Sequence, residues 1–313
     1  MKLAELRLRN QLADEAVAEM EGKLLTEAES SLRLTGPAKV LKPDGQELCI
    51  YLPGAIPEEM RTSTYPELSA IRGKTENRGM ASGTPLFTRG TKRYRSKGVS
   101  SSVLGFFEAS PPFHYCRTTA FTGHEVESWD RIRPLFTYVA REFEKYVPGR
   151  YAVQADYAKG THSEWVIPDT PFTTITVNNT YPTGVHTDKG DLEKGFSALC
   201  TLRRGSYTGG HLTFPKYRVS VDMQDGDLIL MDAHEFHGNT ALKCADCGAN
   251  LDKYGHQCDD AALERLGVLP GDKRTPPERV SVVHYYRTKM AKCGTYDEEM
   301  SKAQVRAEQR SHV

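Results

Sequence analysis

A run of short apolar segments between residues 171 and 242 is the feature that most constrains the fold. Residues with turn propensity separate the segments, which are TTITVN, FSALCTLR, HLTFP, YRVSVDM and DLILMD. Short β-prone segments at this spacing are typical of an antiparallel barrel or a double-sheet roll. A similar segment, RVSVVHYY at 279–286, follows a Cys- and charge-rich insert at 243–278. We therefore predict an α+β fold with a sheet core.

Other stretches predict the elements that flank this core. Residues 38–53 predict two strands joined by a Pro-Asp-Gly turn, and 2–33 predict a helix because leucines recur among charged residues. Helical spacing predicts a second helix at about 126–147, and a short polar helix closes the chain near 297–310. The apolar face of the second helix comprises Trp129, Ile132, Leu135, Phe136, Val139 and Phe143.

The chain is divided accordingly into two parts. An N-terminal helical segment takes residues 1–35, and a single domain takes 36–313, with its sheet core at about 150–290. The sequence does not indicate an oligomeric state.

Bulk composition excludes several classes of protein. The 41 basic and 41 acidic residues cancel, so a nucleic-acid partner would need a local basic patch. We find no apolar run of about 18 residues, and the charged N-terminus lacks a signal-peptide core, so we expect no membrane partner. Seven cysteines without a secretion signal make a disulfide scaffold unexpected. We expect a soluble intracellular protein, from the cytoplasm or, in a eukaryote, from the nucleus.

The segment TYPTGVHTDKGD places His186 and Asp188 on the same side of an extended chain. Two histidines and one carboxylate on one face of Fe(II) leave three positions open for oxygen and a bidentate cosubstrate. The third ligand must come from a later strand, and GDLILMDAHEFHGN offers His234 and His237. We favour His237, which follows the strand after a turn and precedes a glycine, and His234 remains the alternative.

A dicarboxylate cosubstrate needs a cation at its far end. Arg279 begins the strand RVSVVHYY, and alternation along a strand directs Ser281 to the same side. An arginine can bind a carboxylate through two parallel hydrogen bonds, and a serine hydroxyl adds a donor. Arg279 and Ser281 are therefore the predicted site for the C5 carboxylate of 2-oxoglutarate.

The ordered set of His-x-Asp, Gly-Gly, distal His and Arg-x-Ser resembles the TET/JBP branch of Fe(II)/2-oxoglutarate dioxygenases. The resemblance covers roughly residues 75–290, and small members of the phage and bacterial type are the most similar. An insert of about forty residues between the distal His and Arg279 departs from the usual pattern, so Arg279 is assigned by motif. The segments that carry the resemblance are NRGMASG, VLGFFEASPPFHYCRTTAF, TGVHTDKGD, YTGGHLTFPKYRVSVDMQDGDLILMDAHEFHGNT and RVSVVHYYRTKM.

The resemblance implies a double-stranded β-helix of the jelly-roll type with flanking helices. It implies that His186, Asp188 and His237 bind Fe(II) and that Arg279 binds 2-oxoglutarate, with O2 as second substrate. It places Asp191 near the target base. The implied reaction is hydroxylation of the methyl group of a 5-methylpyrimidine in DNA, with 5-methylcytosine as first candidate and thymine as second.

The insert begins KCADCGANLDKYGHQC, which predicts a structural zinc site. Cys244 and Cys247 have the C-x-x-C spacing of a zinc knuckle, and His256 and Cys258 complete a tetrahedral set. Cys293 is an alternative ligand. A short polar insert has few apolar residues, so a metal would supply stability that it otherwise lacks.

A local basic segment at 72–97 is the predicted contact with nucleic acid. It holds eight basic residues against the single acid Glu76. Such a segment can follow phosphates, whereas the ordinary interpretation of a charge run is a solvated face. A base stacked in a duplex must be flipped out to reach a buried iron. The predicted substrate contacts in this segment are Arg78, Lys92, Arg93, Arg95 and Lys97.

Two alternative functions remain open at this point. One is the same 2-oxoglutarate chemistry on a small molecule or a protein side chain, and the basic segment would then have no part in activity. The other is a non-catalytic nucleic-acid-binding module, against which the intact ligand set argues.

Overall fold

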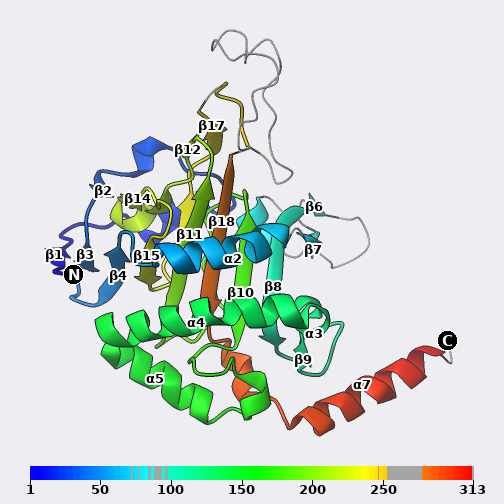
Figure 1. Ribbon diagram of the computed structural model, residues 1–313. Helices are drawn as coiled ribbons and strands as arrows, with labels where there is room; N and C mark the ends of the chain where they lie inside the picture. The colour runs from blue at the N-terminus through cyan, green and yellow to red at the C-terminus, as the bar shows by residue number, and fades with distance from the viewer. Residues whose placement is uncertain are drawn as a thin grey trace.

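The computed structural model describes residues 1–71, 73–76, 78–83, 86–87, 94–95, 98–245, 247–251 and 277–311. A large mixed sheet forms the centre of the molecule (Figure 1). Strand β9 (Arg117–Thr118) pairs with β8 beside the main path. The order along the sheet is β1 (Ala4–Arg7), β3 (Ala38–Leu41), β4 (Glu47–Leu52), β15 (Leu228–Met231), β11 (Ser197–Arg204), β18 (Glu278–Tyr285), β10 (Thr174–Asn179), β8 (Val99–Phe107) and β5 (Lys74–Thr75).

A smaller sheet packs on one face of the large sheet. Its strands, in order, are β16 (Gly238–Asn239), β13 (Leu212–Phe214), β14 (Val219–Val221) and β2 (Leu32–Leu34). Buried apolar side chains from both sheets, among them Leu199, Phe214 and Val283, form one core between them. Two short pairs of strands lie outside these sheets: β12 (Tyr207–Gly209) with β17 (Leu242–Cys244), and β6 (Leu86–Phe87) with β7 (Tyr94–Arg95).

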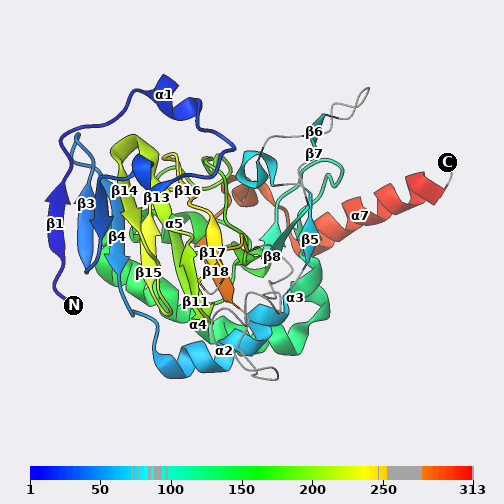
Figure 2. The ribbon, with the colours of Figure 1, turned by 90° about the horizontal axis from the view of Figure 1, so that it is seen from above.

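Helices cover the opposite face of the large sheet (Figures 1 and 2). Helix α4 buries the predicted apolar face, including Ile132, Phe136 and Phe143, against the sheet. The predicted helix at 126–147 and the predicted strands at 38–53 are thus confirmed. The helices are α1 (Asp14–Ala18), α2 (Glu58–Ala70), α3 (Ala120–His124), α4 (Val126–Tyr146), α5 (Pro148–Lys159) and α7 (Tyr296–Ser311), with short 3-10 turns η1 (Glu27–Glu29), η2 (Gly79–Ser82), η3 (Ser163–Trp165), η4 (Pro215–Tyr217) and η5 (Thr288–Lys292).

Strand β18 runs through the middle of the large sheet and divides its side chains between the two layers. Val280 and Val282 pack in the core under the helices, whereas Arg279 and Ser281 line a cavity on the other face. The predicted alternation therefore holds. Polar side chains of the large sheet thus face the space between the two sheets, and its apolar side chains are buried under the helices.

His284 also points into the core under the helices, between Phe136 and Phe172. Its Nδ1 lies 2.8 Å from the carbonyl oxygen of Ala198, and burial lowers its pKa to about 4. An unfolded chain takes up a proton on this histidine near pH 6.5. Stability from the buried neutral ring is therefore complete above pH 6.5 and is lost as the pH falls toward 4.

We expect this loss to be measurable as a difference between wild type and His284→Gln. Between pH 7.5 and pH 4, the wild type should lose about 3 kcal/mol more unfolding free energy than the variant, because a shift of one pKa unit corresponds to about 1.36 kcal/mol. Urea denaturation at both pH values measures the two losses. Equal losses in the two proteins would contradict the assignment.

The predicted helix at 2–33 is wrong. Strand β1 pairs in parallel with β3, α1 is one short helix, and β2 pairs in parallel with β14. Leu6 and Leu8 alternate with arginines, a period that suits a strand edge better than a helix. Helix α2 was not predicted; it contains Pro66 and buries only Thr64 and Leu68.

One disulfide is present, although the sequence did not indicate a disulfide scaffold. Cys116 and Cys293 are bonded, with an S–S distance of 2.06 Å across 177 residues of sequence. The pairing depends on the tertiary fold, which sets the segment before β9 against the segment after η5. This bond removes Cys293 from the candidate zinc ligands. Cys49 and Cys200 are buried and free.

In the part of the chain that the structure describes, we find no helix that is both long and apolar enough to span a membrane. The predicted closing helix near 297–310 is confirmed as α7, which extends away from the body (Figure 1).

Candidate active site

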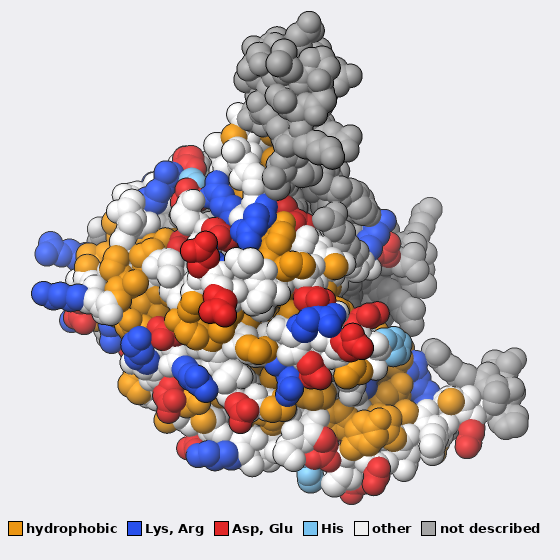
Figure 3. All heavy atoms as spheres, in the orientation of Figure 1, with side chains coloured by type: hydrophobic (Ala, Val, Ile, Leu, Met, Phe, Trp, Pro, Cys, Tyr) orange, Lys and Arg blue, Asp and Glu red, His pale blue; other side chains and the backbone are white. Residues whose placement is uncertain are grey.

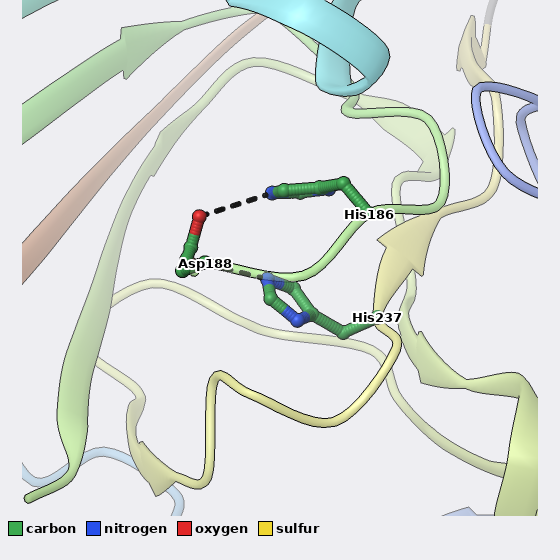
Figure 4. Close-up of side chains that lie close together, drawn as sticks. All are labelled: His186, Asp188 and His237. Carbon is green, nitrogen blue, oxygen red and sulfur yellow. Dashed lines mark ion pairs between the residues drawn. The ribbon is translucent and has the colours of Figure 1, made fainter. Parts of the chain in front are cut away.

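Two loops pair their backbones and bring three candidate ligands together (Figure 4). The His186 N–H donates to the carbonyl of His237 at 2.9 Å, and the His237 N–H donates back at 3.0 Å. The Asp188 carboxylate faces both rings: its two oxygens are each 3.7 Å from one Nε2 atom. Ligand atoms of the three residues all lie within 4.8 Å of one another.

Each imidazole is held with Nε2 toward the carboxylate. His186 Nδ1 lies 2.7 Å from the carbonyl of Gly184, and His237 Nδ1 lies 2.9 Å from that of Glu235. A ring that donates from Nδ1 to a carbonyl keeps its Nε2 lone pair for a metal. Burial, with His186 nearby, lowers the pKa of His237 to about 4, which keeps its ring neutral. Two imidazoles that present Nε2 and one carboxylate fit Fe(II).

His234, the alternative third ligand, lies elsewhere. Its Nδ1 is 3.8 Å from Asp232, and it lines other cavities rather than the one that contains His186. Gly238, directly after His237, explains why His237 rather than His234 lies beside His186. A Cβ at Gly238 would come within 2.9 Å of the Val185 backbone nitrogen, so only glycine permits the close approach of the two loops.

The turn before His237 is fixed by a buried lysine from the β3–β4 hairpin. Lys42 Nζ lies 3.1 Å from Asp232 Oδ2 and 3.0 Å from Glu235 Oε1. The same turn supplies the Ala233 carbonyl that accepts the Asp188 N–H at 2.9 Å. The β3–β4 hairpin thus holds the turn that precedes His237 and that contacts the Asp188 backbone.

A cavity of about 380 Å³ lies between the two sheets, with the His186, Asp188 and His237 cluster on its wall. Arg279 and Ser281 from β18 also line it. Arg279 is only 3% exposed; it donates from Nη1 to the Ser281 hydroxyl, and its Nη2 has no partner among the described residues. Burial lowers the pKa of this guanidinium. A buried cation with a free donor fits an anionic group that enters the cavity.

Another part of the wall carries a buried carboxylate and an ion pair. The Ser197 hydroxyl donates to Asp191 at 2.9 Å. Burial, and then the charge of Asp188, raises the pKa of Asp191 well above its usual value. Arg287 lines the cavity beside it and binds the buried Glu108, with 2.6 Å between Nη2 and Oε1. Sequence reasoning missed Arg287 and Glu108, although both lie in segments that carry the family resemblance.

The other predicted contacts are placed only in part. Arg78 is half-buried and lines the cavity. For Arg95 the structure describes only the backbone, in β7, and Lys92, Arg93 and Lys97 lie outside the described residues. Cys244 is buried on β17 and Cys247 is half-buried, while His256 and Cys258 lie outside the described residues. The zinc site therefore stays a prediction.

Residues 102–288 match the Tet_JBP family, the oxygenase domain of the 2OGFeDO superfamily, over more than half of the chain. The chain belongs to this family. The 2OGFeDO superfamily uses Fe(II), 2-oxoglutarate and O2, in agreement with the predicted cofactors and with the His-Asp-His cluster of this Tet_JBP domain.

Curated relatives of this Tet_JBP domain include the thymine dioxygenase JBP1 of Crithidia fasciculata, 31% identical over 207 residues, which are 64% of this chain and 23% of that protein. Thymine dioxygenase JBP1 of Trypanosoma brucei brucei is 31% identical over 166 residues, which are 50% of this chain and 19% of that protein. The chain thus spans about a quarter of the length of the curated relatives that it matches.

Among solved structures, NgTET1 in complex with 5mC DNA superposes on this Tet_JBP domain with a TM-score of 0.57 and 14% identity. The match covers 95% of this chain and 86% of the other. The likeness confirms the predicted α+β fold with a jelly-roll core.

Proposed function

We propose that this chain is the oxygenase domain of an Fe(II)/2-oxoglutarate-dependent dioxygenase that hydroxylates the methyl group of a 5-methylpyrimidine in DNA. One observation supports this most: the His186, Asp188 and His237 cluster and the free donor of Arg279 lie in a single cavity. The thymine dioxygenases at about 30% identity support the substrate class.

Iron and 2-oxoglutarate together supply activated oxygen for hydroxylation of a C–H bond when they are bound. The chain's own residues hold and orient the reactants. His186, Asp188 and His237 would hold Fe(II), while Arg279 and Ser281 would bind the C5 carboxylate of 2-oxoglutarate through charge-assisted hydrogen bonds. The cosubstrate is thereby oriented toward the cluster.

The target base would enter the same cavity, where Asp191 lies on the wall as a candidate base contact. His237 is only 4% exposed, so a methyl group can reach the cluster only on a base that has left the duplex stack. The ion pair of Arg287 and Glu108 holds this part of the wall in place. For the base itself we keep 5-methylcytosine as first candidate and thymine as second.

The reaction is tested by incubating the protein with Fe(II), ascorbate, 2-oxoglutarate and duplex DNA that contains either 5-methylcytosine or only thymine as its methylated base. Nucleoside digestion and mass spectrometry then detect the hydroxymethyl base. We expect a gain of 16 Da, one oxygen atom, on one of the two bases. Succinate formation with both bases unchanged would contradict the proposed DNA substrate but not the proposed use of Fe(II) and 2-oxoglutarate.

The basic segment separates a DNA substrate from a small molecule or protein substrate. Replacement of Lys92, Arg93, Arg95 and Lys97 by Ala should weaken DNA binding most at low salt, because each phosphate contact contributes about 0.9 to the slope of log K against log salt concentration. Fluorescence anisotropy over a salt series measures this slope. Oxidation of DNA by the variant at the wild-type rate, at every salt concentration, would show that the segment has no part in activity.

A further inference from the structure

Arginine and phenylalanine side chains alternate from the cavity wall to the C-terminal helix. Arg287 lines the cavity and lies over the Phe107 ring, 4.7 Å from its centre. Arg117 lies 5.0 Å from the centre of Phe107 and 4.4 Å from that of Phe113. Arg306 of α7 lies over Phe113 at 4.4 Å. We call these five residues the Arg–Phe row.

The row is built from separate parts of the chain and is fixed at several points. Phe107 ends β8 and Arg117 begins β9, where the two strands pair directly. The disulfide of Cys116 and Cys293 lies next to Arg117 and just before the start of α7. Arg287 is held by the buried Glu108. The arginines are therefore prearranged, which reduces the entropy lost when a ligand binds.

The charges of the row are only partly balanced. Glu108 neutralises Arg287, but Arg117 and Arg306 form no ion pair with a carboxylate among the described residues. Arg117 Nη1 donates to the Glu108 carbonyl at 3.2 Å. Burial lowers the pKa of Arg117; nearby Tyr115 and Glu108 oppose this effect, and the charge of Arg306 adds to it. Two cations on one ring, neither of them in an ion pair with a described carboxylate, form a site that an anion would stabilise.

The surface beside the row is concave. A hollow of about 710 Å³ lies between the 110–115 loop and α7, and Tyr115, His114, Lys302 and Arg306 are among the residues that line it. Strands β6 and β7, within the basic segment, extend on the same side of the body as α7 (Figures 1 and 2). By contrast, the face over α2, α4 and α5 intersperses basic and acidic side chains (Figure 3).

We propose that the Arg–Phe row is the track for the DNA strand that flanks the target nucleotide. Arg117 and Arg306 bind its phosphates, and the row leads the strand from α7 to the cavity wall at Arg287. Successive arginines of the row share a ring at 4.4–5.0 Å, and each DNA strand carries one charge per about 3.4 Å of helix axis, so the row offers more than one phosphate contact. A guanidinium can bind phosphate through two parallel hydrogen bonds while it stays stacked on a ring. This inference rests on the proposed function, since it names a surface for the same substrate.

The test compares wild type with the double variant Arg117→Gln/Arg306→Gln. The probe is a fluorescein-labelled duplex of about 20 base pairs that carries one 5-methylpyrimidine, and anisotropy measures affinity from 50 to 300 mM salt. The slope of log K against log salt concentration should fall by about 2, one for each lost phosphate contact, and affinity at the lowest salt should fall at least tenfold.

A matched control removes the same charge elsewhere. Arg133→Gln/Arg141→Gln changes two arginines of α4, on the helix-covered side of the sheet, and should keep the wild-type slope. All proteins should form succinate from 2-oxoglutarate without DNA at equal rates, since the row does not contact Arg279. Because Arg117 is partly buried, Arg306→Glu on α7 serves as a second variant whose packing cost is small, and it should lower the slope by at least 1.

The outcomes separate the two proposals. If wild type binds and oxidises DNA while the double variant and Arg306→Glu keep its slope and affinity, the track is overturned and the proposed function stands. If wild type itself neither binds nor oxidises DNA, the proposed function fails and the track fails with it. A fall in slope confined to the row variants supports the track.

Discussion

Replacement of Asp188 by Ala is expected to abolish Fe(II) binding. Its carboxylate is the only anionic ligand of the cluster, and its two oxygens lie 3.7 Å from the Nε2 atoms of His186 and His237. Without it, two neutral imidazoles remain, which hold Fe(II) weakly. Loss of an outer-shell partner costs 10–100-fold in metal affinity, so loss of a ligand should cost more than about 100-fold.

The measurement is an anaerobic Fe(II) titration followed by the visible absorption of the iron–2-oxoglutarate complex, with product formation assayed in parallel. His234→Ala is the matched control, because this histidine is close in sequence but lies outside the cluster. It should bind iron as the wild type does. Normal iron binding by Asp188→Ala, or its loss in His234→Ala, would show that the cluster has been assigned wrongly.

Replacement of Arg279 by Met is expected to raise the Kd for 2-oxoglutarate at least about a hundredfold. A hydrogen bond to a charged group contributes about 1.5–3 kcal/mol, and two such bonds to a carboxylate correspond to a factor of more than 100. Arg279→Lys keeps the charge but loses the planar fork, so its affinity should lie between those of wild type and Arg279→Met.

In the absence of ligand, Arg279→Met should not destabilise the protein. Arg279 is a buried cation with an unpaired Nη2, so Arg279→Met removes a desolvation cost and should leave the melting temperature unchanged or raised. The wild type should gain thermal stability when 2-oxoglutarate is added, and the variant should not.

Isothermal titration and thermal unfolding measure the two effects of Arg279→Met. Arg204→Met on the neighbouring β11 is the matched control, because Arg204 binds Asp225 outside the cavity. Equal 2-oxoglutarate affinity in wild type and Arg279→Met would refute the assigned role.

The sequence was sufficient for the parts of the site that follow strand alternation and motif order. The strand pattern predicted β18, and its period of two placed Arg279 and Ser281 on one face. The order of motifs predicted His186, Asp188 and His237, although from the sequence alone His234 remained an alternative. The choice between His237 and His234 depends on the backbone pairing of two loops and on the close approach at Gly238, which are tertiary features.

Other features could not be predicted because they join segments far apart in the chain. The disulfide of Cys116 and Cys293 spans 177 residues, and Lys42 reaches the turn before His237 from the N-terminal hairpin. The N-terminal stretch has leucines that recur among charged residues, which led to the helix prediction, yet its backbone pairs with sheet edges. Pairing with a strand that is already formed satisfies hydrogen bonds that local helical propensity alone does not offer.

The sequence by itself thus determined the type of fold, the candidate ligand types and the strand face that carries the arginine, because these depend on periodicity and residue chemistry. Only the tertiary structure decided which histidine joins the cluster, which cysteines bond and how Arg287, Phe107, Arg117, Phe113 and Arg306 align. Those features depend on distances between segments that are remote in the chain, and packing of the two sheets and the helices fixes these distances.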